Sequence, residues 1–382
     1  MQSAAHQEKH FQQYIIDRLV EQGWKLGDSK FYDTERAVYP EDLESWIKTS
    51  GQQEKWDKLE RLNGAKTLEV LMDRLDKALE KQGTMQVLRQ GFSIAGCGLI
   101  EMTEAAPEDK RNAAVIERYQ ANILRVVPEL KYHPAREFAI DLVLFINGLP
   151  VATVELKTDF TQSAEAAMDQ YRNDRLPYDP KTKRREPLLT FKRGAVVHFA
   201  MSDSVIMMAT KLDGENTFFL PFNKGRKDES GAVHAGNPPG EIKADGTQEY
   251  PVAYFWEAVC QPDAWLRIFH SFVYVEKKDV VDIQGNWSKK ETLIFPRFHQ
   301  WTAVNQMLAD ARENGAGMTY LCDHSAGSGK TSTISWTAHD LVKLRRDNGD
   351  SIFSSVIIVT DRNVLDGQLQ DAVKQIDHQF GV

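Results

Sequence analysis

The chain has 382 residues, 42% of them hydrophobic and 27% charged, which is the composition of an ordinary globular protein with room for two domains. Its formal net charge of −8 excludes a uniformly basic surface for nucleic acid, so any DNA contact has to come from local patches. No apolar run reaches the roughly 20 residues of a membrane span, and the polar first ten residues contain no secretory signal.

Three cysteines are widely spaced and form neither a disulfide framework nor a metal-binding pattern. They are Cys97, Cys260 and Cys322. Together with the missing signal and membrane segments, they predict a cytoplasmic protein that has no membrane partner.

The first third of the chain reads as mainly helical. Apolar residues recur at helical spacing over about 7–22, and Gly23 is a suitable C-terminal cap. A second helical region spans about 40–83, and strand-like runs then begin near 86–88 and 123–127.

The most informative stretch is 139–157, which reads A-I-D-L-V-L-F-I-N-G-L-P-V-A-T-V-E-L-K. Two β-branched, apolar runs flank Asn147-Gly148, the strongest short-range signal for a β-hairpin. Asp141 lies in the first run, and Glu155 and Lys157, two residues apart, project from the same face of the second. Two carboxylates and a lysine on one sheet face are the groups that a Mg²⁺-dependent phosphodiesterase needs.

The hairpin register decides whether the two acids can share a metal. A two-residue turn pairs Ile146 with Leu149 and places Asp141 and Glu155 on opposite faces. A three-residue loop with Gly148 in the left-handed conformation places Asp141 opposite Thr153, with Glu155 diagonal to it at roughly 7–8 Å. We expect that register, or a bulge with the same effect.

A structural alternative is a buried hairpin whose charged residues only cap its ends. Acid-x-Lys is a common string, and by itself it is weak evidence for a nuclease. The position of Asp141 favours a nuclease site over this alternative, because an unpaired charge inside an otherwise apolar strand is costly.

After the hairpin, the sequence predicts a helix over 161–175 and strands over 194–201 and 205–210. A basic segment at 172–193 is either a local DNA-binding patch or a solvated loop. Its cationic residues are Arg172, Arg175, Lys181, Lys183, Arg184, Arg185, Lys192 and Arg193.

A phosphate-binding loop follows farther along the chain. The runs 318–322 and 355–360 read as buried strands on either side of the loop and a helix over 332–344, which is the expected context of a Walker A motif. The loop wraps phosphate with backbone N–H groups, its lysine reaches the β- and γ-phosphates, and its threonine hydroxyl binds Mg²⁺. The candidate nucleotide-binding residues are Ser325, Ala326, Gly327, Ser328, Gly329, Lys330 and Thr331. His324 stands where the strict pattern has glycine.

Gln300 lies upstream, in the string Phe295-Pro-Arg-Phe-His-Gln-Trp301. Its amide suits the adenine edge of ATP, and the alternative is a helix start with buried aromatic residues. We expect three regions: a first domain at 1–250, a helical linker at 251–285 and an incomplete ATPase lobe at 286–382. Because no later acidic motif or second lobe follows, we expect no productive ATP hydrolysis from this chain.

In combination, these strings resemble the motor and endonuclease (R) subunit of type I restriction–modification enzymes. The resemblance covers nearly the whole chain. It rests on the hairpin, the phosphate loop, and the strings Asp169-Gln-Tyr-Arg, Phe219-Leu-Pro-Phe-Asn-Lys-Gly225 and Asp361-Arg-Asn-Val-Leu-Asp366.

The resemblance implies an α/β fold. A restriction-endonuclease-like mixed sheet flanked by helices, with a PD-(D/E)xK nuclease site, would be followed by part of a RecA-like, superfamily 2 double-stranded DNA translocase. It further implies Mg²⁺ and ATP as cofactors, and double-stranded DNA, a methyltransferase subunit and a specificity subunit as partners.

The same resemblance assigns roles to individual residues. Asp141 and Glu155 match the metal-binding acids, and Lys157 matches the lysine that orients water or stabilises charge on the phosphate. Glu8 matches an acid of the N-terminal helix. Gln170 matches the glutamine of the family's Gln-x-x-x-Tyr motif, although Asp174 occupies the tyrosine position and Tyr171 follows Gln170 directly.

Two other functions compete with this one. The chain could be a module that docks DNA or partner subunits and is inactive in isolation. It could also be a stand-alone helicase–nuclease for DNA repair, which would not co-purify with methyltransferase and specificity subunits.

Overall fold

The computed structural model describes residues 4–108, 111–159, 163–228, 230–281 and 285–360, together with 370 and 373. The chain divides into two compact units, Met1–Glu104 with Glu117–Leu266, and Ala105–Ile116 with Arg267–Val382. The stretch 251–285, expected as a linker, is divided between the two units. The string 361–366 lies outside the described residues.

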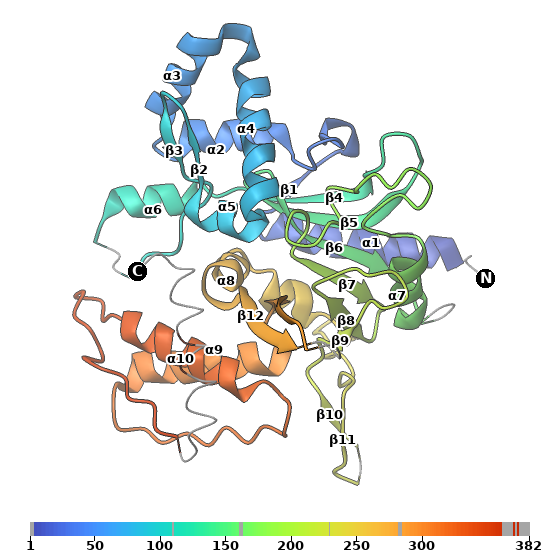
Figure 1. Cartoon of the computed structure of the whole chain (residues 1–382). Coiled ribbons are helices and arrows are strands. Elements are labelled where there is room, and N and C mark those ends of the chain that lie inside the picture. The colour runs from blue at the N-terminus through green and yellow to red at the C-terminus, as the bar shows by residue number, and fades with distance from the viewer. Residues whose placement is uncertain are drawn as a thin grey trace. The chain divides into compact units, whose positions relative to one another are not determined.

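A seven-stranded mixed sheet forms the centre of the first unit, in the order β1–β4–β5–β6–β7–β8–β9 (Figure 1). The pairs β1–β4 and β6–β7 are parallel, and the other neighbours are antiparallel. The α/β class with a mixed sheet flanked by helices is confirmed. The strands are β1 (Lys25–Leu26), β4 (Leu124–Lys131), β5 (Ala139–Ile146), β6 (Leu149–Leu156), β7 (Val197–Met201), β8 (Ile206–Ala209) and β9 (Leu220–Pro221).

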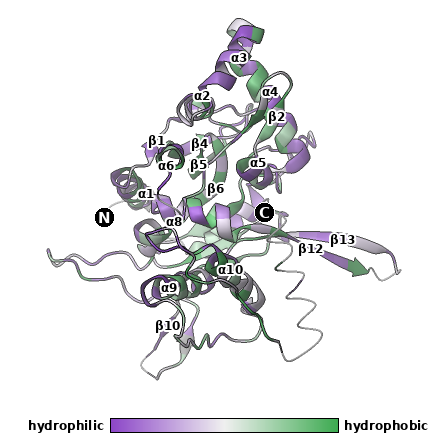
Figure 2. Cartoon of the chain, turned by 90° about the vertical axis from the view of Figure 1, so that its left-hand side faces the viewer, coloured by the Kyte–Doolittle hydropathy of each residue, from purple (hydrophilic) through white to green (hydrophobic). Residues whose placement is uncertain are grey.

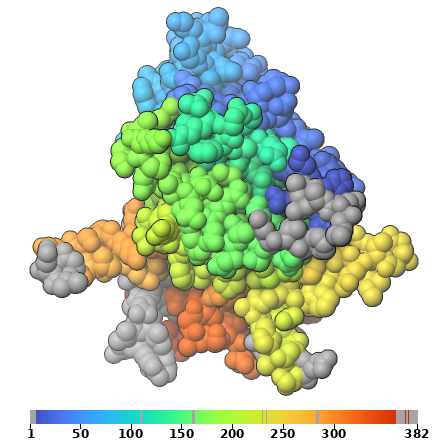
Figure 3. Space-filling model, turned by 90° about the vertical axis from the view of Figure 1, so that its right-hand side faces the viewer, coloured from blue at the N-terminus to red at the C-terminus, as the bar shows by residue number. Residues whose placement is uncertain are grey.

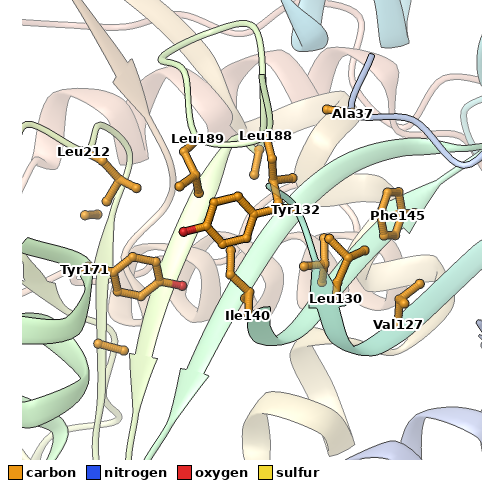
Figure 4. Close-up of a cluster of buried hydrophobic side chains, with 14 of the residues drawn as sticks. Ala37, Val127, Leu130, Tyr132, Ile140, Phe145, Tyr171, Leu188, Leu189 and Leu212 are labelled. Atoms are coloured by element: carbon orange, nitrogen blue, oxygen red, sulfur yellow. The ribbon is translucent and has the colours of Figure 1, made fainter. Parts of the chain in front are cut away.

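Two helices bring further side chains to this sheet, α1 (Ala4–Glu21) and α7 (Ala164–Asn173). The N-cap Ser163 accepts a hydrogen bond from the Glu165 amide and so starts α7. Tyr171 of α7 is fully buried, and its hydroxyl lies 2.7 Å from the Thr153 hydroxyl of β6. In Figure 4 it lies in the hydrophobic core with Tyr132, Ile140, Leu189 and Leu212. The face of β6 that carries Thr153 is therefore the face covered by α7.

A helical insertion precedes the central strands. It contains α2 (Pro40–Thr49), α3 (Gln53–Asn63), α4 (Thr67–Gln82), α5 (Thr84–Gln90), the hairpin β2 (Phe92–Ile94) with β3 (Gly98–Ile100), and short turns at Ser29–Phe31 and Gly64–Lys66. The prediction of a strand at 86–88 is wrong. The short apolar run there is one side of α5, and Gly83 and Gly91, both with positive φ, bound this helix.

The basic segment 172–193 is partly anchored by ion pairs, and its role in DNA binding stays a prediction. Arg193 is buried and pairs with Asp76, 2.6 Å away, and Arg184 pairs with Glu35 at the same distance. Arg185 also reaches Glu80, at 3.4 Å. Three of its eight cationic side chains therefore hold the segment against acids of residues 35–80.

The remaining elements of the chain are shorter or belong mainly to the second unit. They are α6 (Ala113–Gln120), β10 (Arg226–Lys227), β11 (Val233–His234), a π-helix at Phe255–Val259, α8 (Pro262–Arg267), a π-helix at Ile268–Phe272, β12 (Tyr274–Val281), β13 (Trp287–Ile294), α9 (Phe298–Asn314) and α10 (Lys330–Lys343). The β12–β13 ribbon is mostly polar, as the purple of β13 in Figure 2 shows. Phe272, Tyr274, Val304, Leu308 and Trp336 form the core of the second unit.

The strands predicted at 318–322 and 355–360 are wrong for the structure as described. Neither segment pairs with another strand there, and Leu321 and Val359 are 92% and 88% exposed. An apolar run favours a strand, but a strand exists only where a neighbour satisfies its backbone groups. Within the described residues, no helix combines the length and apolarity needed to cross a membrane.

Candidate active site

The turn that joins β5 to β6 is a buried two-residue Asn-Gly turn. Asn147 and Gly148 have φ of 48° and 85°, as a type I′ turn requires. The Asn147 side chain accepts from the Ile123 amide at 2.6 Å and donates to the Met102 carbonyl at 2.8 Å. A Cβ on Gly148 would lie 2.7 Å from the Tyr39 carbonyl oxygen, so only glycine fits.

A β-bulge corrects the register that this turn imposes. Ile146 pairs with Leu149 and Phe145 with Pro150, but Leu144 then pairs with Ala152, which leaves Val151 as the extra residue. Pro150 has no amide hydrogen to continue the ladder there. The bulge foreseen as one alternative is confirmed, whereas the three-residue loop is wrong, and Val143 rather than Asp141 pairs with Thr153.

The bulge places Asp141 and Glu155 on the same face of the sheet. Val143 is opposite Thr153, and the two acids are the next residues outward on that face of β5 and β6. Asp141 Oδ2 accepts the Leu156 amide at 2.6 Å, which ties the first acid to the second strand. The geometric condition set by the sequence is therefore met.

Glu155 is held by Arg175, which was predicted from the sequence only as a member of the basic segment. Glu155 is fully buried, and its Oε1 accepts Nε of Arg175 at 2.5 Å. Arg175 also donates through Nη2 to the Ala139 carbonyl at 2.7 Å. Glu155 Oε2 is buried and has no hydrogen-bond partner among the described residues.

Lys157 follows β6 and meets the N-terminal helix. Its Nζ lies 3.3 Å from Glu8 Oε1 and donates to the Leu156 carbonyl at 2.7 Å. Figure 3 shows the dark blue residues of α1 beside the green residues of the central strands on one face of this unit. The structure thus brings Glu8, Asp141, Glu155 and Lys157 into one cluster.

Gln170 is not joined to this cluster. It is half-buried on α7, and no hydrogen bond or ion pair between its side chain and either acid is found within the described ranges. Its neighbour Tyr171 belongs to the hydrophobic core, and Asp174 is exposed. The catalytic role of Gln170 stays a prediction.

Two more residues near the acids, Gln12 and Glu129, were not predicted from the sequence. Gln12 of α1 donates to the Asp141 carbonyl at 2.7 Å and lies 3.2 Å from Glu129 Oε1. Glu129, a strand residue with a positive φ of 45°, interrupts the β4 ladder between Pro128 and Leu130. Gln12 lies four residues after Glu8, on the same helix face, and this spacing was the available signal.

Both acids are difficult to ionise. Burial raises the pKa of Asp141 above its usual range, against the Leu156 amide and the Lys157 ammonium, which lower it. Burial also raises the pKa of Glu155 well above its usual range, and the neighbouring Asp141 carboxylate raises it further, while Arg175 opposes both effects. Two adjacent carboxylates with raised pKa are typical of a functional site.

The residues fit a single magnesium ion. Mg²⁺ is commonly bound through one or two carboxylates, with waters or phosphate completing its coordination. Asp141 and Glu155 supply two, and the unpartnered Glu155 Oε2 is an available ligand atom. No group of three or more His, Cys, Asp or Glu residues suited to a metal occurs among the residues described.

The phosphate loop lies in the second unit and is open to solvent. Gly327 and Gly329 have φ of 75° and 84°, and Gly329 caps α10, so the helix N-terminus begins at the loop. Lys330 Nζ donates to the carbonyls of His324 and Ser325, at 2.8 and 2.9 Å. The Lys330 ammonium therefore lies over the loop, bound to two carbonyl oxygens. A phosphate group could take the place of these oxygens as its partner.

Gln300 is tied to this loop. Its Nε2 donates to the Gly329 carbonyl at 2.9 Å, and its Oε1 accepts the Arg297 amide at 2.9 Å. The side chain is 4% exposed. Both ends of the amide therefore have protein partners, and the adenine role stays a prediction.

The fold and site define an α/β protein with a restriction-endonuclease-like mixed sheet and a compact acid–lysine cluster. Residues 6–217 match the family described as type I restriction enzyme R protein N terminus, and the chain belongs to this family. Residues 299–381 match the SWI2/SNF2 ATPase family.

Two relatives are similar to the chain at 24% identity. The HindI type I restriction enzyme endonuclease subunit of Haemophilus influenzae matches 63% of this chain. A Methanocaldococcus jannaschii protein, described as a type I restriction enzyme MjaVIIIP endonuclease subunit, matches 66%. The chain covers 21% of the length of each relative.

Proposed function

We propose that the first unit is a Mg²⁺-dependent DNA endonuclease and that the chain acts within the R subunit of a type I restriction enzyme. One observation carries the proposal: the bulged hairpin places Asp141 and Glu155 on one sheet face, with Lys157 directly after the same strand. Membership of the R protein family supports it, as do the names of the two relatives.

The residues have separate roles in phosphodiester cleavage. Asp141 and Glu155 would hold Mg²⁺, which polarises a phosphate oxygen and lowers the pKa of a bound water. Lys157 carries a positive charge beside them, in a partly buried place where its attraction for developing negative charge is stronger than in water. Glu8 positions the Lys157 ammonium through their 3.3 Å contact.

The second unit contributes nucleotide binding in this proposal. Residues 325–331 would hold the phosphates of ATP, and Lys330 would leave its two carbonyl partners for the β- and γ-phosphates. The match to SWI2/SNF2 ATPases supports a motor that moves along double-stranded DNA. Methyltransferase and specificity subunits would select the DNA that is cut.

The test is DNA cleavage by the full R subunit assembled with its methyltransferase and specificity subunits. Glu155→Gln keeps the side-chain shape but removes a metal-binding charge, and we expect cleavage to fall by about 10²–10³-fold or more. DNA-dependent ATP hydrolysis should persist, because the phosphate loop is untouched. Asp169→Asn, at an exposed position on α7, is the matched control and should cut normally.

Two outcomes would favour the competing functions. Normal cleavage by the Glu155→Gln complex would reduce the hairpin to a structural or docking element. Failure to co-purify with methyltransferase and specificity subunits, with cleavage intact, would favour a stand-alone nuclease of DNA repair.

A further inference from the structure

We propose that Arg175 is a positioning residue that presents Glu155 to the divalent cation. The proposal rests on the proposed nuclease function and assigns a role to a residue outside the acid–lysine string. It is carried by the contacts of the Arg175 guanidinium and by the one carboxylate oxygen that these contacts leave bare.

The guanidinium connects the two strands that carry the acids. Nε contacts Glu155 Oε1 on β6 at 2.5 Å, while Nη2 contacts the carbonyl of Ala139, two residues before Asp141 on β5, at 2.7 Å. Because the guanidinium is planar and its donors are fixed relative to one another, both bonds together restrict the direction of the Glu155 carboxylate. A lysine has no such fork.

The grip on Glu155 uses one oxygen only. Arginine often binds a carboxylate through both oxygens, but here Oε2 of the fully buried Glu155 has no partner in the part of the chain that the structure describes. A buried acceptor without a partner is unfavourable, and a cation bound at Oε2 would relieve that cost. The free oxygen therefore points to a ligand that neither Arg175 nor any other described group supplies.

Arg175 is itself fixed in place. Its side chain is largely buried, and its guanidinium lies 6.0 Å from the centre of the Tyr132 ring. Its amide donates to the Gln170 carbonyl at 3.1 Å, at the end of α7. Arg172, three residues earlier, differs: it is more exposed and pairs with Asp169 on its own helix, at 3.0 Å.

The experiment measures binding of Mn²⁺ alone, without DNA, to the 382-residue chain by electron paramagnetic resonance. Partners that orient metal ligands typically contribute about 10–100-fold to metal affinity. We expect Arg175→Ala to weaken Mn²⁺ binding by about that factor and Arg172→Ala to leave it unchanged. Arg175→Lys keeps the charge without the fork and should recover only part of the affinity.

The outcomes separate this proposal from the nuclease assignment. If wild-type chain binds Mn²⁺ and Glu155→Gln abolishes binding, but Arg175→Ala binds equally well or more tightly, the positioning role is overturned and the nuclease site stands. If wild-type chain does not bind Mn²⁺, the proposed metal site fails and the role of Arg175 fails with it. Should Arg175→Ala not fold, Arg175→Lys decides, because wild-type affinity in that variant would show that charge alone is sufficient.

Discussion

The acid cluster at the β5–β6 hairpin and the phosphate loop before α10 differ in how their surroundings hold them. The hairpin occupies the middle of a seven-stranded sheet, and Glu155 is fully buried there. Lys330 is exposed, and the apolar segments on either side of the loop and helix have no strand partner within the described part of the chain. The acid cluster is therefore built into a packed core, whereas the phosphate loop depends mainly on its own backbone conformation.

This difference separates stability from binding. Substitutions at the hairpin should change both the free energy of unfolding and metal binding. Its charged groups are withdrawn from water and depend on protein partners instead. Changes at the phosphate loop should alter nucleotide binding and leave folding nearly unchanged. Four predictions test this contrast, in order of decreasing effect.

The largest effect is expected from Glu155→Ala. It leaves Arg175 buried without its carboxylate, and breaking a buried ion pair from one side costs about 3–5 kcal/mol of unfolding free energy. Urea denaturation followed by circular dichroism measures it. Glu165→Ala, an exposed position on α7, is the control, and equal stability of the two variants would refute the contrast.

A smaller effect is expected from Lys330→Ala. Removing the ammonium should weaken ATP binding by about 100-fold, since hydrogen bonds to charged groups contribute about 1.5–3 kcal/mol each. Titration with a fluorescent ATP analogue gives the affinity. Unfolding free energy and Mn²⁺ binding should match wild type, and a large loss of stability would show that the loop is part of a core after all.

Gln300→Ala should have a modest effect on stability. It removes the hydrogen bonds to Arg297 and Gly329, which contribute about 1–2 kcal/mol together. Thermal unfolding of the second unit measures this change, with the exposed Gln306→Ala on the same helix as control. An effect on ATP affinity much larger than the effect on stability would instead support the adenine role.

The smallest effect is a pH dependence at Asp141. Because burial raises the pKa of this carboxyl in the folded chain, the folded state binds more protons than the unfolded state above pH 3.8. Its contribution to stability therefore decreases as pH rises from 3.8 towards the raised value. Asp141→Asn should remove that decrease in chemical denaturation at stepped pH; an identical pH profile would contradict the shift.

The part of the candidate site that lies within one hairpin could be predicted from the sequence, because its residues are close together in the chain. Strand periodicity and the Asn-Gly turn located Asp141, Glu155 and Lys157. Counting residues required either a three-residue loop or a bulge, and the structure has the bulge. Arg175 was missed because it is 20 residues from Glu155 in the chain, and a contact at that separation depends on how α7 packs. The ion pair between Arg193 and Asp76 was missed for the same reason, since it joins segments far apart in the chain.

The errors have a common physical cause. Short apolar runs at 86–88, 318–322 and 355–360 have strand-like composition, but only neighbouring chain determines whether a strand forms. At 86–88 two flanking glycines fit helix ends, and the run packs as one side of α5. At the other two runs, no partner lies within the described residues.

The bulge at Val151 limits how the length of this hairpin can vary among related proteins. Inserting or deleting one residue between Asp141 and Glu155 would turn one acid to the opposite side of the sheet, whereas a change of two residues would keep both on one side. A relative whose hairpin differs by one residue must gain or lose a bulge to keep its two acids together. Loop length and bulge therefore have to evolve as a single trait.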